Sequence, residues 1–171
     1  MVIYSRRWEV TVSKRAESLA DRILQGAKAL AEYAQGLDEA QWQTPVAGDG
    51  RPIGVVVHHV ASVYPIEVDL AQTLAAGDPI EGVTWPVIHD MNAKHASDHA
   101  AVSKSEALEL LRHNSAEAAS RVRGMTDDEL DSAATVSLNG GAPLTAQFFI
   151  EDHALRHSFH HLSRIRDTLS A

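Results

Sequence analysis

The chain has 171 residues, 44% of them hydrophobic, and a formal net charge of -8 with its ten histidines neutral. This length and apolar content are typical of one globular domain with a sizeable core, so we expect a single domain over residues 1–171. The acidic balance, without a cluster of Lys or Arg, argues against nucleic acid or an anionic membrane as a partner. The sequence contains no cysteine, which excludes disulfides, thiolate ligands and a cysteine nucleophile.

The N-terminal stretch lacks the apolar core of a signal peptide. No apolar run along the chain approaches the length of a transmembrane helix. We therefore expect a cytoplasmic protein.

The first half of the chain predicts two long helices separated by a loop. The first helix is expected from Ser13, a suitable N-cap, to about Ala34. A loop rich in proline and glycine follows, with the sequence LDEAQWQTPVAGDGRP. The second helix is expected to begin near Pro52 and to end before Gly77, with a kink at Pro65.

The second half predicts one further helical region and a final helix. Residues 86–123 are expected to form either two helices or one helix broken near residues 103–105. After the loop TVSLNGGAP, a fourth helix is expected from about Leu144 to the C-terminus. The stretch VVVHHV has the residue types of a strand, but the apolar residues that follow it recur at helical spacing, which favours a helix.

These segments together predict an all-α protein, an up-and-down four-helix bundle with a long or broken third helix. Bundles of this kind build metal sites from side chains on facing helices. We expect the tryptophans to anchor the core or the loops; they are Trp8, Trp42 and Trp85.

Four histidines lie close together near the C-terminus, in EDHALRHSFHHLSRIRD. On a helical wheel His157 and His161 lie at the edge of the apolar arc, whereas His153 and His160 lie on the polar side. The inward pair is spaced i, i+4, which places two imidazoles one turn apart on one face. Two such rings can reach one metal ion at roughly 2.0–2.1 Å each.

The second helix supplies a third candidate ligand. His59 lies at the border of its apolar side, and His58 points away from that side. A border histidine on one helix and a border pair on another is the arrangement that a three-histidine site requires. The sequence does not establish that the two helices are neighbours.

Other polar residues are candidates for supporting roles. His95 lies within an apolar stripe, where it either lines a pocket or is a partly buried, hydrogen-bonded histidine. His99, at the flank of that stripe, is assigned to the surface. The remaining candidates for a pocket, or for orienting a ligand histidine, are Tyr64, Glu67, Asn92 and Glu151. Glu67 and Glu151 are more simply edge residues of their helices, and Tyr64 and Asn92 are the candidates for a pocket.

Three stretches of the chain resemble the DinB-like superfamily of four-helix bundle metalloproteins. RPIGVVVHHVAS is similar to the start of the family's second helix, and HSFHHLSRIRDTL is similar to its last-helix motif. LDEAQWQTPVAGDG looks like the connection between the first two helices. The resemblance covers nearly the whole chain and places His59, His157 and His161 at the ligand positions.

The resemblance implies an open divalent metal site with three protein ligands. Zinc is the first expectation, and nickel, iron and manganese are alternatives that the ligand type does not separate. The superfamily includes thiol-dependent S-transferases and mycothiol-dependent maleylpyruvate isomerases. The isomerase branch carries a glutamate at the position of His157, which favours the all-histidine transferase or uncharacterised branches here.

Three hypotheses follow for the function. The first is a metal-dependent transferase-like enzyme, in which a low-molecular-weight thiol cosubstrate, or water, is activated for reaction with a small electrophile. The second is a non-catalytic, stress-related bundle that binds a metal. The third is a bundle without a metal, in which the histidines are ordinary core and surface residues. A small-molecule substrate and a homodimer are the partners we expect.

Overall fold

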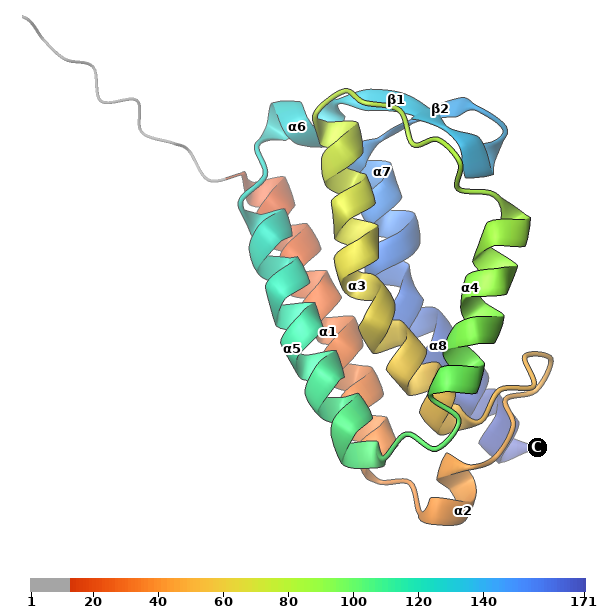
Figure 1. Ribbon diagram of the computed structural model, residues 1–171. Coiled ribbons are helices and arrows are strands. Elements are labelled where there is room, and N and C mark those ends of the chain that lie inside the picture. Colours follow the sequence, from red (N-terminus) through yellow and green to blue (C-terminus); the bar gives the residue numbers. More distant parts are fainter. Residues whose placement is uncertain (1–12) are drawn as a thin grey trace, which may run out of the picture.

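The computed structural model describes residues 13–171 and shows an all-α bundle, as predicted (Figure 1). Four long helical segments form it: α1 (Lys14–Gln35), α3 (Ile53–Ala75), α5 (Lys104–Arg123) and a last segment that ends in α8 (Arg156–Ser170). Helix α1 packs between α5 and α8, and α3 packs against α5 and the last segment. The faces that meet bury small and branched apolar side chains, so one continuous core runs through the bundle.

Helix α1 begins where the sequence predicts it. The Ser13 side chain accepts a hydrogen bond from the backbone N–H of Ala16, which satisfies one of the free donors of the first turn. The helix ends at Gln35, and Gly36 caps it. The predicted limits, Ser13 and Ala34, therefore differ from the observed ones by one residue at each end.

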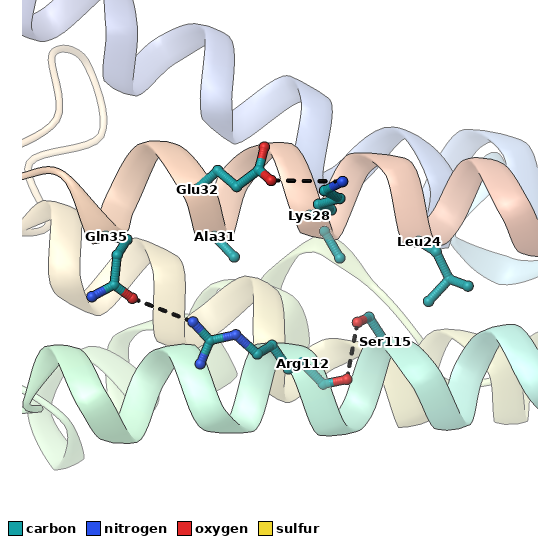
Figure 2. A pocket seen from close by; sticks show the side chains of 8 residues that line it. Leu24, Lys28, Ala31, Glu32, Gln35, Arg112 and Ser115 are labelled. Atoms are coloured by element: carbon teal, nitrogen blue, oxygen red, sulfur yellow. Dashed lines mark hydrogen bonds and ion pairs between the residues drawn. The ribbon is translucent and has the colours of Figure 1, made fainter.

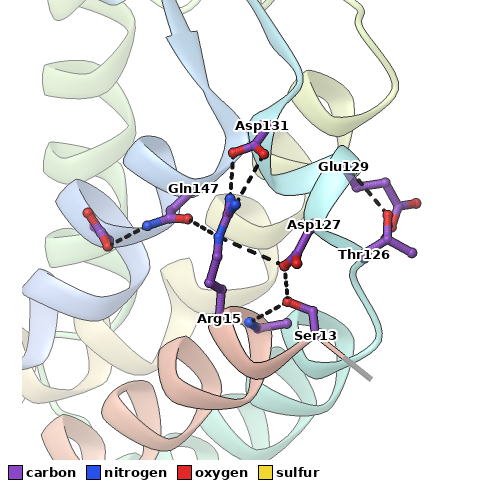
Figure 3. A network of polar contacts seen from close by, with 9 residues as sticks. Ser13, Arg15, Thr126, Asp127, Glu129, Asp131 and Gln147 are labelled. Carbon is purple, nitrogen blue, oxygen red and sulfur yellow. Dashed lines mark hydrogen bonds and ion pairs between the residues drawn. The ribbon is translucent and has the colours of Figure 1, made fainter. Parts of the chain in front are cut away.

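A polar network fixes the N-terminus of α1 to two other elements (Figure 3). The Ser13 hydroxyl donates to Oδ1 of Asp127, in the short helix α6 (Asp127–Asp131), at 2.5 Å. The Arg15 guanidinium donates to Asp131 at 2.5 Å and to Gln147, in helix α7 (Ala146–Ile150), at 2.9 Å. These contacts orient the start of α1 against both chain segments.

The connection between α1 and α3 contains a short helix that the sequence did not predict. Helix α2 (Glu39–Trp42) is closed by a reciprocal capping box between Asp38 and Gln41. The Trp42 ring is 1% exposed, and its Nε1–H donates to the carbonyl oxygen of Val102 at 3.1 Å. Trp42 is thus a core anchor.

Neither of the other two tryptophans is seen to anchor the core. Trp85 is 60% exposed, so the prediction that it anchors the core or a loop is wrong. Trp8 lies outside the described residues.

Helix α3 is the central helix of the fold. It runs from Ile53 to Ala75 without a break at Pro65. By length and composition it is apolar enough to cross a membrane, which the sequence reading did not recognise, but 67% of its most apolar window is buried inside the bundle. Burial on several sides explains its continuous apolar run and identifies it as a core helix.

The third predicted region consists of two helices. Five residues separate helix α4 (Trp85–Asp98) from α5, which begins at Lys104, and Ser103 caps α5 by accepting a hydrogen bond from the N–H of Glu106. The predicted break near residue 103 is therefore confirmed. Figure 1 shows α4 beside α3, away from α1 and α5, and none of the α4 residues 85–98 is buried.

A β-hairpin precedes the last helical segment, where the sequence predicted only a loop. Strand β1 (Ala133–Val136) pairs antiparallel with β2 (Ala142–Thr145). Gly140 and Gly141 have φ angles of 67° and 78°, the left-handed region that glycine occupies without steric cost. The strands have only four residues each, so the period-two pattern was too short to read.

The last helical segment is not a regular α-helix throughout. Thr145 caps α7, and a π-helical turn (Glu151–Leu155) joins α7 to α8. A π-turn accommodates one extra residue, which rotates the side chains before it relative to those after it. The helical wheel used above therefore holds for α8 but not for the residues of the turn.

Candidate metal centre

His59 lies in the first half of α3 and is buried, with 6% of its surface exposed. Helix α3 starts directly after Pro52, whose fixed φ suits a helix start, and a run of valines packs the following turn into the core. This packing holds the His59 ring in the interior of the bundle.

His157 and His161 lie one turn apart on α8 and face His59. Their rings stack on each other with centroids 4.9 Å apart. The His59 ring lies 5.2 Å from His157 and 5.7 Å from His161, each in an edge-on arrangement. One ring nitrogen from each of the three residues lies within 4.8 Å of the other two. The structure thus brings together the three histidines that the sequence singled out.

Glu67 holds the ring of His157 from behind. Its Oε1 lies 2.6 Å from Nδ1 of His157, and the carboxylate is buried, with a residue exposure of 7%. Glu67 stands eight residues after His59 on α3, so the helix that supplies His59 also supplies this carboxylate. The Nδ1–H of His157 donates to Glu67, which leaves Nε2 of the same ring free.

Two buried polar atoms in this group have no hydrogen-bond partner among residues 13–171. They are Nδ1 of His161 and Oε2 of Glu67. Buried polar atoms are rarely left without a partner, so an ion or a bound molecule is expected here. Three imidazoles that converge, one of them held by a carboxylate, are a donor set that fits a divalent metal.

Burial keeps two of the three histidines neutral. Burial, together with the neighbouring His157, lowers the pKa of His59 to about 2 and that of His161 to about 3. A neutral imidazole has a free lone pair on one nitrogen. The rings are therefore in the protonation state that metal coordination requires over the whole physiological range.

The metal-free protein is expected to lose stability as the pH falls from about 7 to 5. His59 and His161 have a lower pKa in the folded state than in the unfolded chain, so the unfolded chain binds more protons below about pH 6.5. At pH 5 each of these two histidines therefore lowers the unfolding free energy by about 2 kcal/mol relative to its value above about pH 6.5.

Urea unfolding of chelated protein at the two pH values measures this effect. His161→Gln should reduce the difference, and His113→Gln, whose side chain is 74% exposed on α5, should leave it unchanged. An unfolding free energy of the metal-free wild type that does not change with pH would contradict the assignment.

His58 and His99 depart from the sequence prediction. His58 was expected to point away from the apolar side, but it is 4% exposed because α4 covers that face of α3. His99 was assigned to the surface, but it is half-buried with its ring 4.0 Å from that of His58. His95 is half-buried and hydrogen-bonds to His58, in agreement with the second of its two predicted roles.

The polar histidines of the last segment behave differently from each other. His160 is exposed, as the helical wheel indicated. His153 is half-buried and stacks on Phe149 at 4.2 Å, so its assignment to the outward face is wrong. His153 lies in the π-helical turn, where the regular wheel does not apply.

The remaining candidates lie at varying distances from the group. Tyr64 is fully buried and its hydroxyl is 2.7 Å from that of Ser158, which is the environment of a core residue rather than a pocket residue. Glu151 accepts a hydrogen bond from Gln147, and within residues 13–171 it forms no hydrogen bond with a histidine. Asn92 is half-buried on α4, three residues before His95.

Three surface grooves of the described chain lie away from these histidines. The largest, about 560 Å³, runs between α1 and α5 beside the Lys28–Glu32 ion pair and the Arg112–Gln35 hydrogen bond (Figure 2). Two others have volumes of about 480 and 290 Å³. No histidine lines any of the three.

Comparison with known proteins agrees with this architecture. A solved structure described as YfiT from Bacillus subtilis, with an unusual four-helix bundle topology, matches with a TM-score of 0.72 at 16% identity, covering 94% of this chain and 89% of that one. No curated protein matches the sequence significantly.

The family comparison is more specific. The model of the DinB superfamily matches residues 22–165. A single domain over residues 1–171 stays a prediction. The match includes the three converging histidines, all of α3 and α5, and most of α1 and of the last helical segment, and the chain therefore belongs to the DinB superfamily.

Proposed function

We propose that the chain is a metal-dependent enzyme that activates a low-molecular-weight thiol, or water, for reaction with a small electrophile. The observation that carries the proposal is the convergence of His59, His157 and His161, with Glu67 holding His157. Zinc is the metal we expect first. A small-molecule substrate, a homodimer and a cytoplasmic location stay predictions.

The protein residues have defined roles in this proposal. His59, His157 and His161 would hold the ion through one nitrogen each, and Glu67 would keep the His157 ring in its tautomer and orientation. A divalent metal bound there would supply a Lewis acid that lowers the pKa of a thiol or water at an open coordination position. Because all three ligands are neutral, they would not offset the positive charge of the ion.

The position of the Arg51 guanidinium favours a reactant that carries a negative charge. The guanidinium contributes to lowering the pKa of His59, His95 and His161, which places its positive charge near all three rings. The Asp49 carboxylate accepts hydrogen bonds from Nε and Nη2 of this guanidinium, at 2.7 and 2.8 Å. The third nitrogen, Nη1, is buried and has no hydrogen-bond partner among residues 13–171. We infer that Nη1 would receive an anionic group, such as a carboxylate, on the thiol or on the electrophile.

The water variant has support from a fold neighbour. The YfiT structure is described as a probable metal-dependent hydrolase. Hydrolysis and thiol transfer would use the same three ligands and differ only in the nucleophile. The experiment below therefore includes both.

Loss of the Glu67 charge is expected to weaken metal binding. Glu67→Gln should lower metal affinity about 10- to 100-fold, because the amide holds His157 less firmly and removes a negative charge behind it. Glu117→Gln is a matched control, because Glu117 lies on the surface 3.8 Å from the exposed His113. Titration with zinc against a chromogenic chelator measures both variants. Equal affinity of Glu67→Gln and wild type would show that Glu67 does not support the ligand.

Turnover by the metal-loaded protein tests the function. Chelated and metal-reconstituted protein are compared with a panel of thiols against epoxide, halide and maleylpyruvate acceptors, and with carboxylate esters in the absence of thiol. We expect activity to fall at least about 100-fold on chelation and to return with one preferred metal. Acceptors that carry a carboxylate should be preferred over their neutral methyl esters.

The second candidate is a non-catalytic, stress-related metal-binding protein. One observation favours it: His59 and His161 are each only 6% exposed. Under this alternative the metal is bound with the same ligands, but no acceptor in the panel is turned over. The assay thus separates the two functions.

A further inference from the structure

A second group of three histidines lies between α3 and α4. It consists of His58 from α3, His95 from α4 and His99, the residue that follows the end of α4, and one ring nitrogen of each lies within 4.8 Å of the other two. Successive residues of a helix point about 100° apart. The adjacent residues His58 and His59 therefore face different neighbours, and each joins a separate group.

One pair of nitrogens in the second group is already at the distance that separates two ligands of one ion. Nδ1 of His58 lies 2.9 Å from Nε2 of His95. Two nitrogens bound to one ion at roughly 2.0–2.1 Å are separated by about 2.9 Å at a right angle and by about 3.4 Å at the tetrahedral angle. The His99 ring completes the group, with centroids 4.0 Å from His58 and 4.7 Å from His95.

One further polar atom lies beside these nitrogens. The Ser62 hydroxyl oxygen lies 3.3 Å from Nδ1 of His58 and 3.5 Å from Nε2 of His95, so three polar atoms of the chain face one point. Without an ion, the pair His58 and His95 is satisfied by one hydrogen bond, in which one ring donates and the other accepts.

Hydrophobic packing contributes little to the position of α4. None of residues 85–98 is buried, and three large apolar side chains of α4 are exposed by 43–60%: Trp85, Val87 and Met91. The last two turns of α4 approach the first half of α3 at the histidines (Figure 1). An ion held there would therefore fix α4 to the bundle more firmly than its side-chain packing does.

We propose that His58, His95 and His99 form a second divalent-metal site, which fixes α4 against α3 beside the first histidine group. The two sites share no ligand. They are neighbours, because the His95 ring lies 5.5 Å from the His59 ring. An ion at the second site would hold His95 and α4 in place at the edge of the proposed reaction centre. The second site does not depend on which reaction, if any, the first one supports.

Metal stoichiometry tests the proposal with the full-length, untagged protein. After equilibrium dialysis against zinc, elemental analysis should find two ions per chain in the wild type and one in His99→Ala. His161→Ala should retain one ion, and the double variant His99→Ala with His161→Ala should retain none. His113→Ala is the control for zinc bound at surface histidines and should retain two.

The outcomes separate the two sites. If the wild type and His99→Ala bind the same number of ions, the second site is wrong, whatever His161→Ala shows. If His99→Ala loses one ion and His161→Ala loses none, the second site stands and the first fails. Loss of an ion in His113→Ala would also overturn the proposal, because a surface ion would then account for the count.

Hydrogen exchange provides a readout of the structural role. Zinc should slow the amide exchange of residues 85–98 at least about tenfold in the wild type and in His161→Ala, but not in His99→Ala. His99 is half-buried, so its replacement should leave the bundle folded. Exchange of α4 that is unaffected by zinc in the wild type would contradict the fixation of this helix.

Discussion

Replacing His161 by Ala should abolish metal binding at the first histidine group. The ring is buried against His157 and His59, so its removal leaves two nitrogen ligands and an apolar void in place of the third. Loss of a carboxylate that merely supports a ligand typically costs 10- to 100-fold in affinity. Loss of the ligand itself should cost more than about 100-fold. Zinc affinity measured by chelator competition, with the count of ions per chain, gives the result.

His160→Ala is the matched control for this variant. His160 is the preceding residue on the same helix, with its ring 5.1 Å from that of His161, but its side chain faces solvent. Its replacement should leave zinc affinity within about twofold of the wild type. Equal losses in the two variants would show that helix orientation does not decide which histidine binds, and that the assignment of His161 is wrong.

Replacing Gly54 by Ala is expected to give the largest loss of stability. A Cβ atom at this position would lie 2.4 Å from Nε1 and Cε2 of Trp42, closer than any real contact. The indole is fully buried and its N–H is bonded to the carbonyl of Val102, so it cannot move without breaking that bond. Overpacking costs typically 1–3 kcal/mol and an unpaired buried donor about the same. We expect a loss of about 3 kcal/mol.

Thermal and urea unfolding measure this loss. For a chain of this size, about 3 kcal/mol corresponds to a decrease in Tm of roughly 6–12 °C. Gly36→Ala is the control: its φ is -79°, and the nearest atom to an added Cβ is the Tyr33 carbonyl oxygen at 3.6 Å, an ordinary contact. That variant should be as stable as the wild type or slightly more so. A Gly54→Ala protein with an unchanged Tm would show that Trp42 has room to shift.

Much of the first histidine group was readable from the sequence, because its ligands lie on regular helices. His157 and His161 follow the π-helical turn, and from Arg156 onward the last segment has ordinary α-helical geometry. The wheel therefore placed these two residues correctly relative to each other, and spacing alone brought their rings together. His59 was found in the same way, at the border of an apolar face. That these residues bind a metal stays a prediction.

The second histidine group was not readable because it depends on tertiary packing. A wheel assumes one buried face, but α3 is covered by the bundle on one side and by α4 on another, so His58 is buried on the face that looked polar. Helix α4 buries none of its residues, so its apolar stripe gave no signal for where it packs. A polar contact between two helices leaves no periodic pattern in the sequence.

The π-helical turn Glu151–Leu155 can accommodate an inserted residue without moving the histidine pair that follows it. An extra residue in a continuous α-helix would rotate all later side chains by about 100° and carry a histidine pair off its face. Where the extra residue is absorbed in one wide turn, the helix before it and the helix after it keep their own faces. Relatives of this chain should therefore differ in length by one residue at this turn, while the spacing of the pair that follows it remains constant.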